Sequence, residues 1–459
     1  MPPLSDQTPE LTDVFAYIDA HRQDYLERLI DYLRHPSISA HGEGIGEVAA
    51  YIADVMQRTG LRARVLPTAG WPMVLGERLE RPGAPTVLLY GHYDVQPPDP
   101  LDAWLSPPFE PAIRDGKLYA RGVGDNKGQH FANILALEAW LTCRGTLPCN
   151  VRFLLEGEEE VGSPHMPGFA RDHHDEIMAD LVITSDGPVQ ESGQSQVLFG
   201  VRGVLSFELR TVGANRDLHS GNWGGIAPNP LWTLVHLLAS MKDEYGRITI
   251  AGFYEDVQPL TTLERQALER LPSDIERVKQ SLGLQQLDQP LERGLMERLS
   301  AWPTLTINGL HGGYGGPGSK TVLPHEAFAK CDIRLVEAQR ADDIFAKVVE
   351  HARRHAPGAQ VIHQGAMEPS KTPLDSPYAG PIRHAVLAAQ GREPLLVPAM
   401  GGSLPDYIFT KTLGIPAFVV PYANADEANH APNENLEIER FYMGIKTGAA
   451  MLAYLGAME

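Results

Sequence analysis

The chain has 459 residues, of which 43% are hydrophobic and 21% are charged. This composition is typical of a folded protein, and the length predicts roughly two or three domains. Asp and Glu number 58 against 39 Lys and Arg, which gives a formal net charge of −19. Such a charge repels polyphosphates and anionic lipids, so nucleic acid is not expected as a partner. A local arginine can still bind a small carboxylate.

The first ten residues contain neither a basic segment nor an apolar run, and no stretch of the chain suggests a membrane helix. The three cysteines, Cys143, Cys149 and Cys331, include no C-x-x-C pair. We interpret them as core thiols and exclude a disulfide framework. These features predict a cytoplasmic protein with no membrane partner.

Hydrophobic periodicity predicts alternating helices and strands in the first part of the chain. The expected helices cover residues 11–33, 45–59 and 127–143, and the expected strands cover residues 86–90, 150–155 and 181–184. This alternation indicates an α/β fold. Each strand leads into a segment with histidine or carboxylate side chains. Because sites in open α/β sheets lie beyond the carboxyl ends of the strands, we expect a functional site at that edge.

The pattern changes near Phe199. The expected strands there cover residues 204–211, 304–308 and 327–335 and a segment near Val361, and the expected helices cover residues 229–241 and 341–355. We therefore predict an inserted α+β domain over residues 200–370. Residues 1–199 and 371–459 then form the other domain.

A glycine-rich tract contains the pattern Gly313-x-Gly315-x-x-Gly318. In dinucleotide-binding proteins this pattern follows a strand and opens a helix. Here Pro317 and the strand-like residues after Ser319 contradict a helix, so we do not expect a dinucleotide cofactor.

Two short motifs carry candidate metal ligands. In His92-Tyr93-Asp94, the imidazole can bind a metal while Asp94 supports it. A hydrogen-bonded turn histidine is the alternative. In Gly124-Asp125-Asn126, a carboxylate stands between glycine and a helix and could bridge two cations. The alternative there is a helix cap.

A third motif runs from Glu156 to Ser163 and places four glutamates directly after an apolar strand. Closely spaced carboxylates repel one another unless cations or protons intervene, so one glutamate can bind a metal while its neighbour transfers protons. A solvated acidic loop is the alternative and suits Glu158. With Asp186 and His430, these segments can hold two metal ions, which favours metal-assisted hydrolysis.

These segments resemble the co-catalytic zinc metallopeptidase family of carnosine dipeptidases, glutamate carboxypeptidases, acetylornithine deacetylase and succinyl-diaminopimelate desuccinylase. The resemblance covers nearly the whole chain. It rests on the stretches 91–97, 120–128, 156–163, 217–221 (Asp-Leu-His-Ser-Gly), 320–324 (Lys-Thr-Val-Leu-Pro) and 401–405 (Gly-Gly-Ser-Leu-Pro). It implies a zinc-exopeptidase-like catalytic domain, with helices on both faces of a central mixed sheet, and an inserted lid and dimerisation domain over residues 200–370.

The resemblance also assigns the metal ligands. It implies that His92 and Asp186 hold one divalent ion, that Glu160 and His430 hold the other, and that Asp125 bridges them, with a cis peptide bond after Asp125. The flanking glycines fix the register of the family's E-G-x-E-E-x-G-S pattern, so Glu159 is the expected general base. Nitrogen and oxygen ligands without a thiolate favour zinc, and cobalt or manganese would suit the same ligands.

The resemblance places further site residues in the inserted domain and near its end. His219 is expected to stabilise the oxyanion across the interface of a homodimer. Arg334 is the expected anchor for a substrate carboxylate, because a planar guanidinium matches a carboxylate. Thr321, Ser403 and Gly402 are expected to add substrate contacts.

The resemblance implies hydrolysis of an amide bond in dipeptides or small peptides with a free terminal carboxylate. Glu159 would take a proton from a water activated by the two ions and return it to the leaving nitrogen. Residues 374–378 lack the substrate-facing histidine of carnosine-type dipeptidases, which leaves the substrate preference open. The alternatives are an N-acyl amino acid deacylase and a catalytically silent dimeric binding protein.

Overall fold

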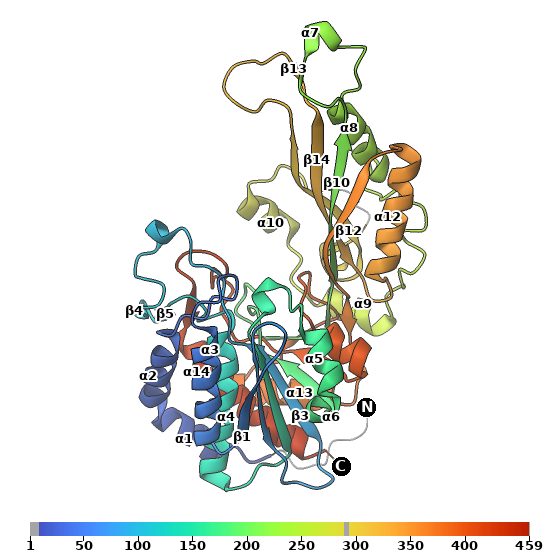
Figure 1. Ribbon diagram of the computed structural model, residues 1–459. Coiled ribbons are helices and arrows are strands. Elements are labelled where there is room, and N and C mark those ends of the chain that lie inside the picture. Colours follow the sequence, from blue (N-terminus) through green and yellow to red (C-terminus); the bar gives the residue numbers. More distant parts are fainter. Residues whose placement is uncertain (1–8, 289–292, 459) are drawn as a thin grey trace. The chain divides into compact units, whose positions relative to one another are not determined.

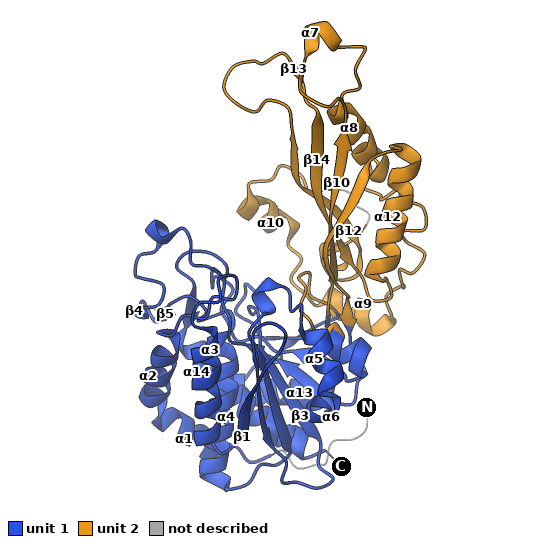
Figure 2. Cartoon of the chain, in the orientation of Figure 1, with its two compact units in different colours: residues 1–200, 371–398, 408–459 blue, residues 201–370, 399–407 orange. Residues whose placement is uncertain are grey.

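The computed structural model describes residues 9–288 and 293–458. Most of the N-terminal segment in which no leader was expected, residues 1–8, lies outside this part. The chain divides into two compact units (Figure 2): residues 1–200, 371–398 and 408–459 form the first, and residues 201–370 and 399–407 form the second.

One segment differs from the predicted boundaries. Residues 399–407 were assigned to the catalytic domain, but they belong to the second unit. Hydrogen bonds explain this placement, because Arg202 Nε donates to the Gly401 carbonyl oxygen at 3.0 Å and Arg334 Nη1 donates to Ser403 Oγ at 2.9 Å. Periodicity could not reveal such contacts, since the partners are far apart in the sequence.

The first unit is built on an eight-stranded mixed sheet (Figure 1). In spatial order its strands are β1 (Arg62–Leu66), β2 (Met73–Arg78), β6 (Asn150–Glu156), β3 (Thr86–His92), β7 (Leu181–Thr184), β18 (Ala417–Val419), β8 (Gln196–Leu198) and β17 (Leu395–Val397). The central strands β6, β3 and β7 are parallel neighbours, whereas β1 and β2 are antiparallel. Strand β3 is almost continuously apolar and buried, as expected for a parallel strand covered on both faces.

Helices cover both faces of this sheet, as the resemblance implied (Figure 1). They are α1 (Thr12–Ala20), α2 (Arg22–Leu33), α3 (Ile45–Arg58), α4 (Lys127–Arg144), α5 (Met166–Asp172), α6 (His174–Ile177), α13 (Ala379–Gln390) and α14 (Ile438–Gly456). Successive residues of β3 point to opposite faces. Tyr90 packs on Phe409, which lies in a segment that contacts α5, whereas the Cα of Gly91 faces His130 of α4.

Two expected elements differ in extent. The single helix predicted over residues 11–33 is two helices, separated at His21, whose backbone leaves the helical conformation and whose Nδ1 lies 2.8 Å from the Tyr17 carbonyl oxygen. A small three-stranded sheet, β19 (Asn435–Glu437), β5 (Lys117–Tyr119) and β4 (Ala112–Arg114), was not predicted. Its strands are too short to show a hydrophobic period.

The second unit is an antiparallel sheet with helices. The sheet has the order β12 (Thr304–Gly312), β14 (Glu326–Leu335), β10 (Gly203–Val212) and β15 (Gln360–Met367). Its helices are α7 (Ser220–Trp223), α8 (Pro230–Met241), α9 (Thr262–Glu269), α10 (Ile275–Leu282), α11 (Leu295–Ala301) and α12 (Ala341–His355). A short ladder joins β11 (Leu218–His219) to β13 (Val322–Leu323), and β9 (Gly200–Val201) and β16 (Ser370–Lys371) lie at the unit boundaries.

Each unit has its own apolar core. In the second unit, alternate residues of β10 and β14 point into the core, and Ile344, Val348 and Ala352 of α12 pack on the sheet at helical spacing. Among the residues that the structure describes, no helix has the length and apolar character needed to cross a membrane.

Candidate metal centre

Five separate segments of the first unit carry the predicted ligands. His92 ends β3, the segment with Glu159 and Glu160 follows β6, and Asp186 follows β7. Because these three strands are parallel neighbours, their carboxyl ends meet at one edge of the sheet. Asp125 directly precedes Asn126, the N-cap of α4, and His430 lies in the loop between β18 and β19.

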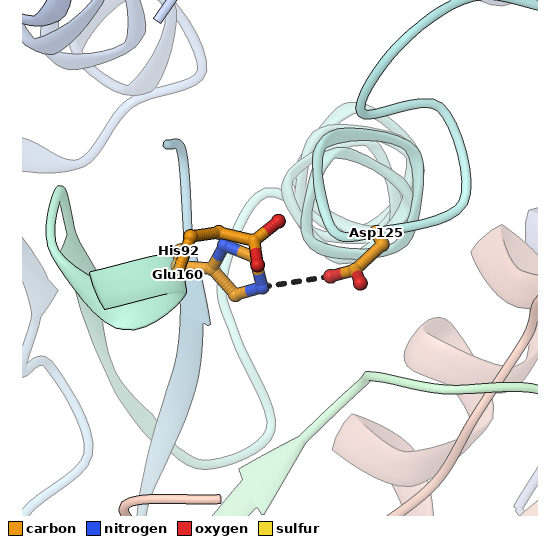
Figure 3. A group of neighbouring side chains, drawn as sticks. All are labelled: His92, Asp125 and Glu160. Atoms are coloured by element: carbon orange, nitrogen blue, oxygen red, sulfur yellow. Dashed lines mark ion pairs between the residues drawn. The ribbon is translucent and has the colours of Figure 1, made fainter. Parts of the chain in front are cut away.

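The five predicted ligands form one continuous set of contacts. His92 Nε2 lies 3.1 Å from Asp125 Oδ1 and 3.5 Å from Asp186 Oδ2. His430 Nε2 lies 3.0 Å from Asp125 Oδ2 and 3.1 Å from Glu160 Oε2. Asp125 therefore stands at the centre, with one carboxylate oxygen toward each histidine. Figure 3 shows His92, Asp125 and Glu160, with the first of these contacts dashed.

These side chains fit a divalent cation. His92 Nε2 is buried and makes no hydrogen bond of good geometry with any residue in the described part of the chain. One ligand atom from each of His92, Asp125 and Glu160 lies within 4.8 Å of the others. A cation among the carboxylates would give this nitrogen a partner and balance the negative charge. Imidazole and carboxylate ligands of this kind suit zinc, cobalt or manganese.

The electrostatics of these side chains also fit a divalent cation. Burial raises the pKa of Glu159 well above its ordinary value, and the charges of Asp186, Glu160 and Asp125 raise it further, against the opposing effect of His92. Hydrogen bonds to Asp125 and Glu160 raise the pKa of His430 to about 10. Burial alone would raise the pKa of Asp125, but the close contacts and positive charges of the two histidines lower it overall. A divalent cation among these carboxylates would offset the repulsion between their charges.

Asp94 supports both neighbouring motifs. Its carbonyl oxygen lies 3.1 Å from His92 Nδ1, and its carboxylate Oδ1 lies 3.4 Å from the same nitrogen. The carboxylate also accepts from the backbone amides of Glu159, at 3.3 Å, and Glu160, at 3.1 Å. Asp94 therefore orients the imidazole and the turn that carries both glutamates.

The backbone at Asp125 has the unusual form that the resemblance implied, because the peptide bond to Asn126 is cis. Residues missed by the sequence interpretation hold this loop. Glu434 accepts from the amides of Gly122 and Gly124 at 2.9 Å and of Asp125 at 3.1 Å, and it pairs with Arg121 at 2.8 Å. Both side chains of that pair are only 1% exposed. A signal was available, since each is a charged residue within four positions of a predicted ligand.

Gln96 was also missed, although it lies in a stretch that carries the resemblance. Its Nε2 donates to Glu160 Oε2 at 2.9 Å and to the Glu160 carbonyl oxygen at 3.0 Å. Glu160 is therefore held from one side by Gln96 and from the other by His430. Side-chain amides of this kind orient a metal-binding carboxylate without changing its charge.

The remaining predicted residues lie in the second unit and form two pairs. Arg334 near the end of β14 donates to Ser403 Oγ, next to Gly402. Exposed His219 has its Nε2 3.4 Å from Thr321 Oγ1. Thr321 precedes β14, and the eight steps of extended strand from Glu326 to Arg334 span about 26 Å. Within one chain, the two pairs are therefore far apart.

The comparisons with known proteins agree with this geometry. The model of Peptidase family M20/M25/M40 matches residues 88–454. Human Beta-Ala-His dipeptidase is 29% identical over 476 aligned positions, covering 98% of this chain and 93% of that protein. The Cys-Gly metallodipeptidase DUG1 of Saccharomyces cerevisiae is 28% identical, with 97% and 98% covered.

A solved structure supports the same assignment. The M20 family metallo-carboxypeptidase Sso-CP2 from Sulfolobus solfataricus is 34% identical and superposes with a TM-score of 0.88, covering 95% of this chain and 99% of that one. These matches confirm the resemblance drawn from the motifs and the mixed α/β fold. Because the family model spans well over half of the sequence, this protein belongs to Peptidase family M20/M25/M40.

Proposed function

We propose that this protein is a metal-dependent dipeptidase that hydrolyses dipeptides or other small peptides with a free terminal carboxylate. The observation that carries the proposal is the convergence of five ligand side chains in one continuous set of contacts with Asp125 at its centre. The names of the two curated relatives, a Beta-Ala-His dipeptidase and a Cys-Gly metallodipeptidase, favour dipeptides over N-acyl amino acids.

In this proposal, His92 and Asp186 would hold one divalent ion, Glu160 and His430 would hold a second, and Asp125 would be shared between them. The contacts around Asp125 support this division, because each of its oxygens faces a different histidine. Zinc is our choice of metal, with cobalt or manganese as substitutes. When bound, the ions would acidify a water and polarise the peptide carbonyl.

Glu159 is the proposed general base. Its amide is fixed by Asp94, and its carboxyl lies close enough to His92 and Asp186 to be influenced by their charges. Burial raises its pKa, which makes the carboxylate a better proton acceptor. Glu159 takes a proton from the attacking water and passes it to the leaving nitrogen, so that one residue serves both halves of the reaction.

The cysteines are poor candidates for an alternative nucleophile. Burial raises the pKa of Cys149 and of Cys331 to about 12, so both thiols stay protonated near neutral pH. All three cysteines are free thiols. Free thiols are typical of a reducing compartment, which supports our proposal of a cytoplasmic location.

The second unit supplies the proposed substrate contacts. Arg334 would bind the terminal carboxylate, with Ser403 and Gly402 beside it, and His219 and Thr321 would contact the scissile amide. An extended dipeptide spans only about 7 Å, far less than the separation of the two pairs along β14. One chain therefore cannot offer both pairs to the same substrate, which supports a homodimer in which His219 and Thr321 come from the partner.

The test is a substrate panel assayed with and without metal. Protein treated with a chelator should lose turnover and regain it with Zn²⁺, Co²⁺ or Mn²⁺. Unmodified dipeptides should be cleaved faster than N-acetyl amino acids, and dipeptides with an amidated C-terminus should be poor substrates. Faster cleavage of the N-acyl compounds would favour the deacylase alternative, and no turnover with any of these metals would support a binding protein.

A further inference from the structure

One buried glutamine of α4 uses its whole side-chain amide on the backbone of the site loops. Gln129 is 1% exposed. Its Nε2 donates to the carbonyl oxygens of Gly124, at 2.7 Å, and Gly187, at 3.2 Å. Its Oε1 accepts from the amide of Tyr422 at 2.7 Å. A glutamine amide has two donors and one carbonyl acceptor, so every group is engaged.

Two of the residues that Gln129 contacts are sequence neighbours of proposed metal ligands. Gly124 directly precedes Asp125, and Gly187 directly follows Asp186. Both aspartates face the same nitrogen of His92, at 3.1 and 3.5 Å, so their negative charges lie close together and repel. Gln129 joins the two loops that this repulsion would separate.

Neighbouring polar residues at the N-cap and in the first turns of α4 extend the same connection. Asn126 Nδ2 donates to the Ser185 carbonyl oxygen at 2.6 Å, and Asn133 Nδ2 donates to Ser185 Oγ at 2.9 Å. The Tyr422 hydroxyl in turn donates to Asn133 Oδ1 at 3.0 Å. With Gln129, these residues form a buried polar face at helical spacing, 126, 129 and 133, which is directed at the site loops.

We propose that Gln129 is a positioning residue that sets the spacing of Asp125 and Asp186 before metal binds. The proposal rests on the metal centre proposed above. Because α4 is rigid, the hydrogen bonds from Gln129 hold the main-chain carbonyls of both loops at fixed positions. Asp125 and Asp186 are therefore already arranged when the cation binds, and binding does not have to order them. Gln129 itself touches neither the metal nor the substrate.

The experiment compares two buried glutamines in the full-length protein. Gln339 is 0% exposed, and its Nε2 donates to the Phe253 carbonyl oxygen at 2.8 Å while its Oε1 accepts from the Val336 amide at 3.1 Å. It lies in the second unit, remote in the sequence from every proposed ligand. Gln129→Met and Gln339→Met remove similar buried amides, so both are expected to lower the unfolding temperature of the metal-free protein.

Zinc affinity, measured by competition with a chromophoric chelator, distinguishes the two. Gln129→Met should weaken Zn²⁺ binding by about tenfold to a hundredfold, the usual effect of removing a group that orients metal ligands, whereas Gln339→Met should bind as the wild type does. The visible spectrum of the Co²⁺ form should change only in Gln129→Met, because its ligand geometry is altered.

Equal zinc affinity in wild type and Gln129→Met would overturn the inference, as would an equal loss in Gln339→Met. If Gln129→Met does not fold, Gln129→Asn serves under the same criteria, because its amide is one methylene too short to reach both carbonyl oxygens. A wild-type protein that binds no divalent ion would overturn the proposed function and the inference together. Two bound ions in the wild type, with unchanged affinity in the variants, would overturn only the inference.

Discussion

The two units place their polar residues in opposite ways. In the first, the parallel strands β6, β3 and β7 end at one edge, so loops distant in sequence meet there. In the second, the antiparallel strand β14 separates its polar pairs, with Thr321 before one end and Arg334 near the other. The carboxyl ends of neighbouring parallel strands bring side chains from several segments close together, whereas residues near opposite ends of one long antiparallel strand remain far apart.

This difference indicates which unit can bring its proposed site residues together within a single chain. The first unit assembles all five proposed ligands from its own residues. The second offers two pairs that a single small peptide cannot reach together within one chain. We therefore expect variants of the first unit to act within their own subunit, and variants of the second to show effects that depend on the partner.

The largest expected effect concerns the proton transfer assigned to the first unit. Glu159→Gln should lower kcat by at least about a hundredfold, because the amide cannot accept the proton of the attacking water. The bound metal, measured by atomic absorption, should be unchanged because Glu159 is not a proposed ligand. Glu158→Gln is the matched control, since Glu158 belongs to the same run of glutamates but contacts His165 outside the run. Normal turnover of Glu159→Gln would remove it from the mechanism.

The second-largest expected effect concerns the buried ion pair of Arg121 and Glu434 in the first unit. Glu434→Gln should lower the free energy of unfolding by about 3–5 kcal/mol, because it leaves Arg121 buried without its ionic partner. In the exposed pair of Arg58 and Asp54, the side chains are 67% and 62% exposed, and Asp54→Asn should cost less than about 1 kcal/mol. Urea titrations measure both. A similar cost for the two variants would mean that the Arg121 pair does not stabilise the loop.

The close contacts of His430 predict a pH dependence of the metal-free protein. Its pKa of about 10 lies above the ordinary 6.5, because of the hydrogen bonds to Asp125 and Glu160. The resulting stability is fully present below pH 6.5 and is lost as the pH rises toward 10. Urea titrations across this range should show the loss in wild type and a smaller one in His430→Asn.

The same protonation should oppose metal binding. Zinc must displace the proton of His430, so zinc affinity should rise with pH, by up to about tenfold per unit for each proton displaced. Calorimetry in buffers of different ionisation enthalpy would count the released protons. An affinity independent of pH, with no proton release, would contradict the protonated state of His430 in the metal-free site.

The smallest expected effect tests directly whether His219 of the second unit acts across the interface of a homodimer. In a heterodimer of a His219→Ala chain and an Arg334→Ala chain, one site would receive both intact residues and the other neither. Purified heterodimers should therefore show about half of the wild-type activity, although each parent homodimer is impaired. Two differently tagged chains, purified in tandem, allow the measurement. Activity no higher than in the parents would show that His219 acts within its own subunit.

Much of the fold was accessible from periodicity. The strands that deliver His92, Glu159, Glu160 and Asp186 were placed within two residues of their observed ends, because buried parallel strands appear as short apolar runs. The break at His21 and the short strands β4, β5 and β19 were not predicted. A single residue or a three-residue strand is too short for a hydrophobic period to register.

The site was predictable only in part. The ligand candidates came from motifs, and the structure brings them together as expected. Gln129, Glu434 and Arg121 were missed because their importance lies in partners up to about three hundred residues away. Glutamine in a helix also has no local signature that separates a solvent-exposed amide from one that holds two loops.

The amino-acid sequence by itself determined which chemical groups are available and that they follow strand ends, because residue type and hydrophobic period are local properties. Only the tertiary structure decided which groups meet, including the placement of each Asp125 oxygen toward a different histidine, the assignment of residues 399–407 to the second unit, and the separation of Arg334 from Thr321. Such distances depend on strand order and direction, which arise when the whole sheet packs and not within any one segment.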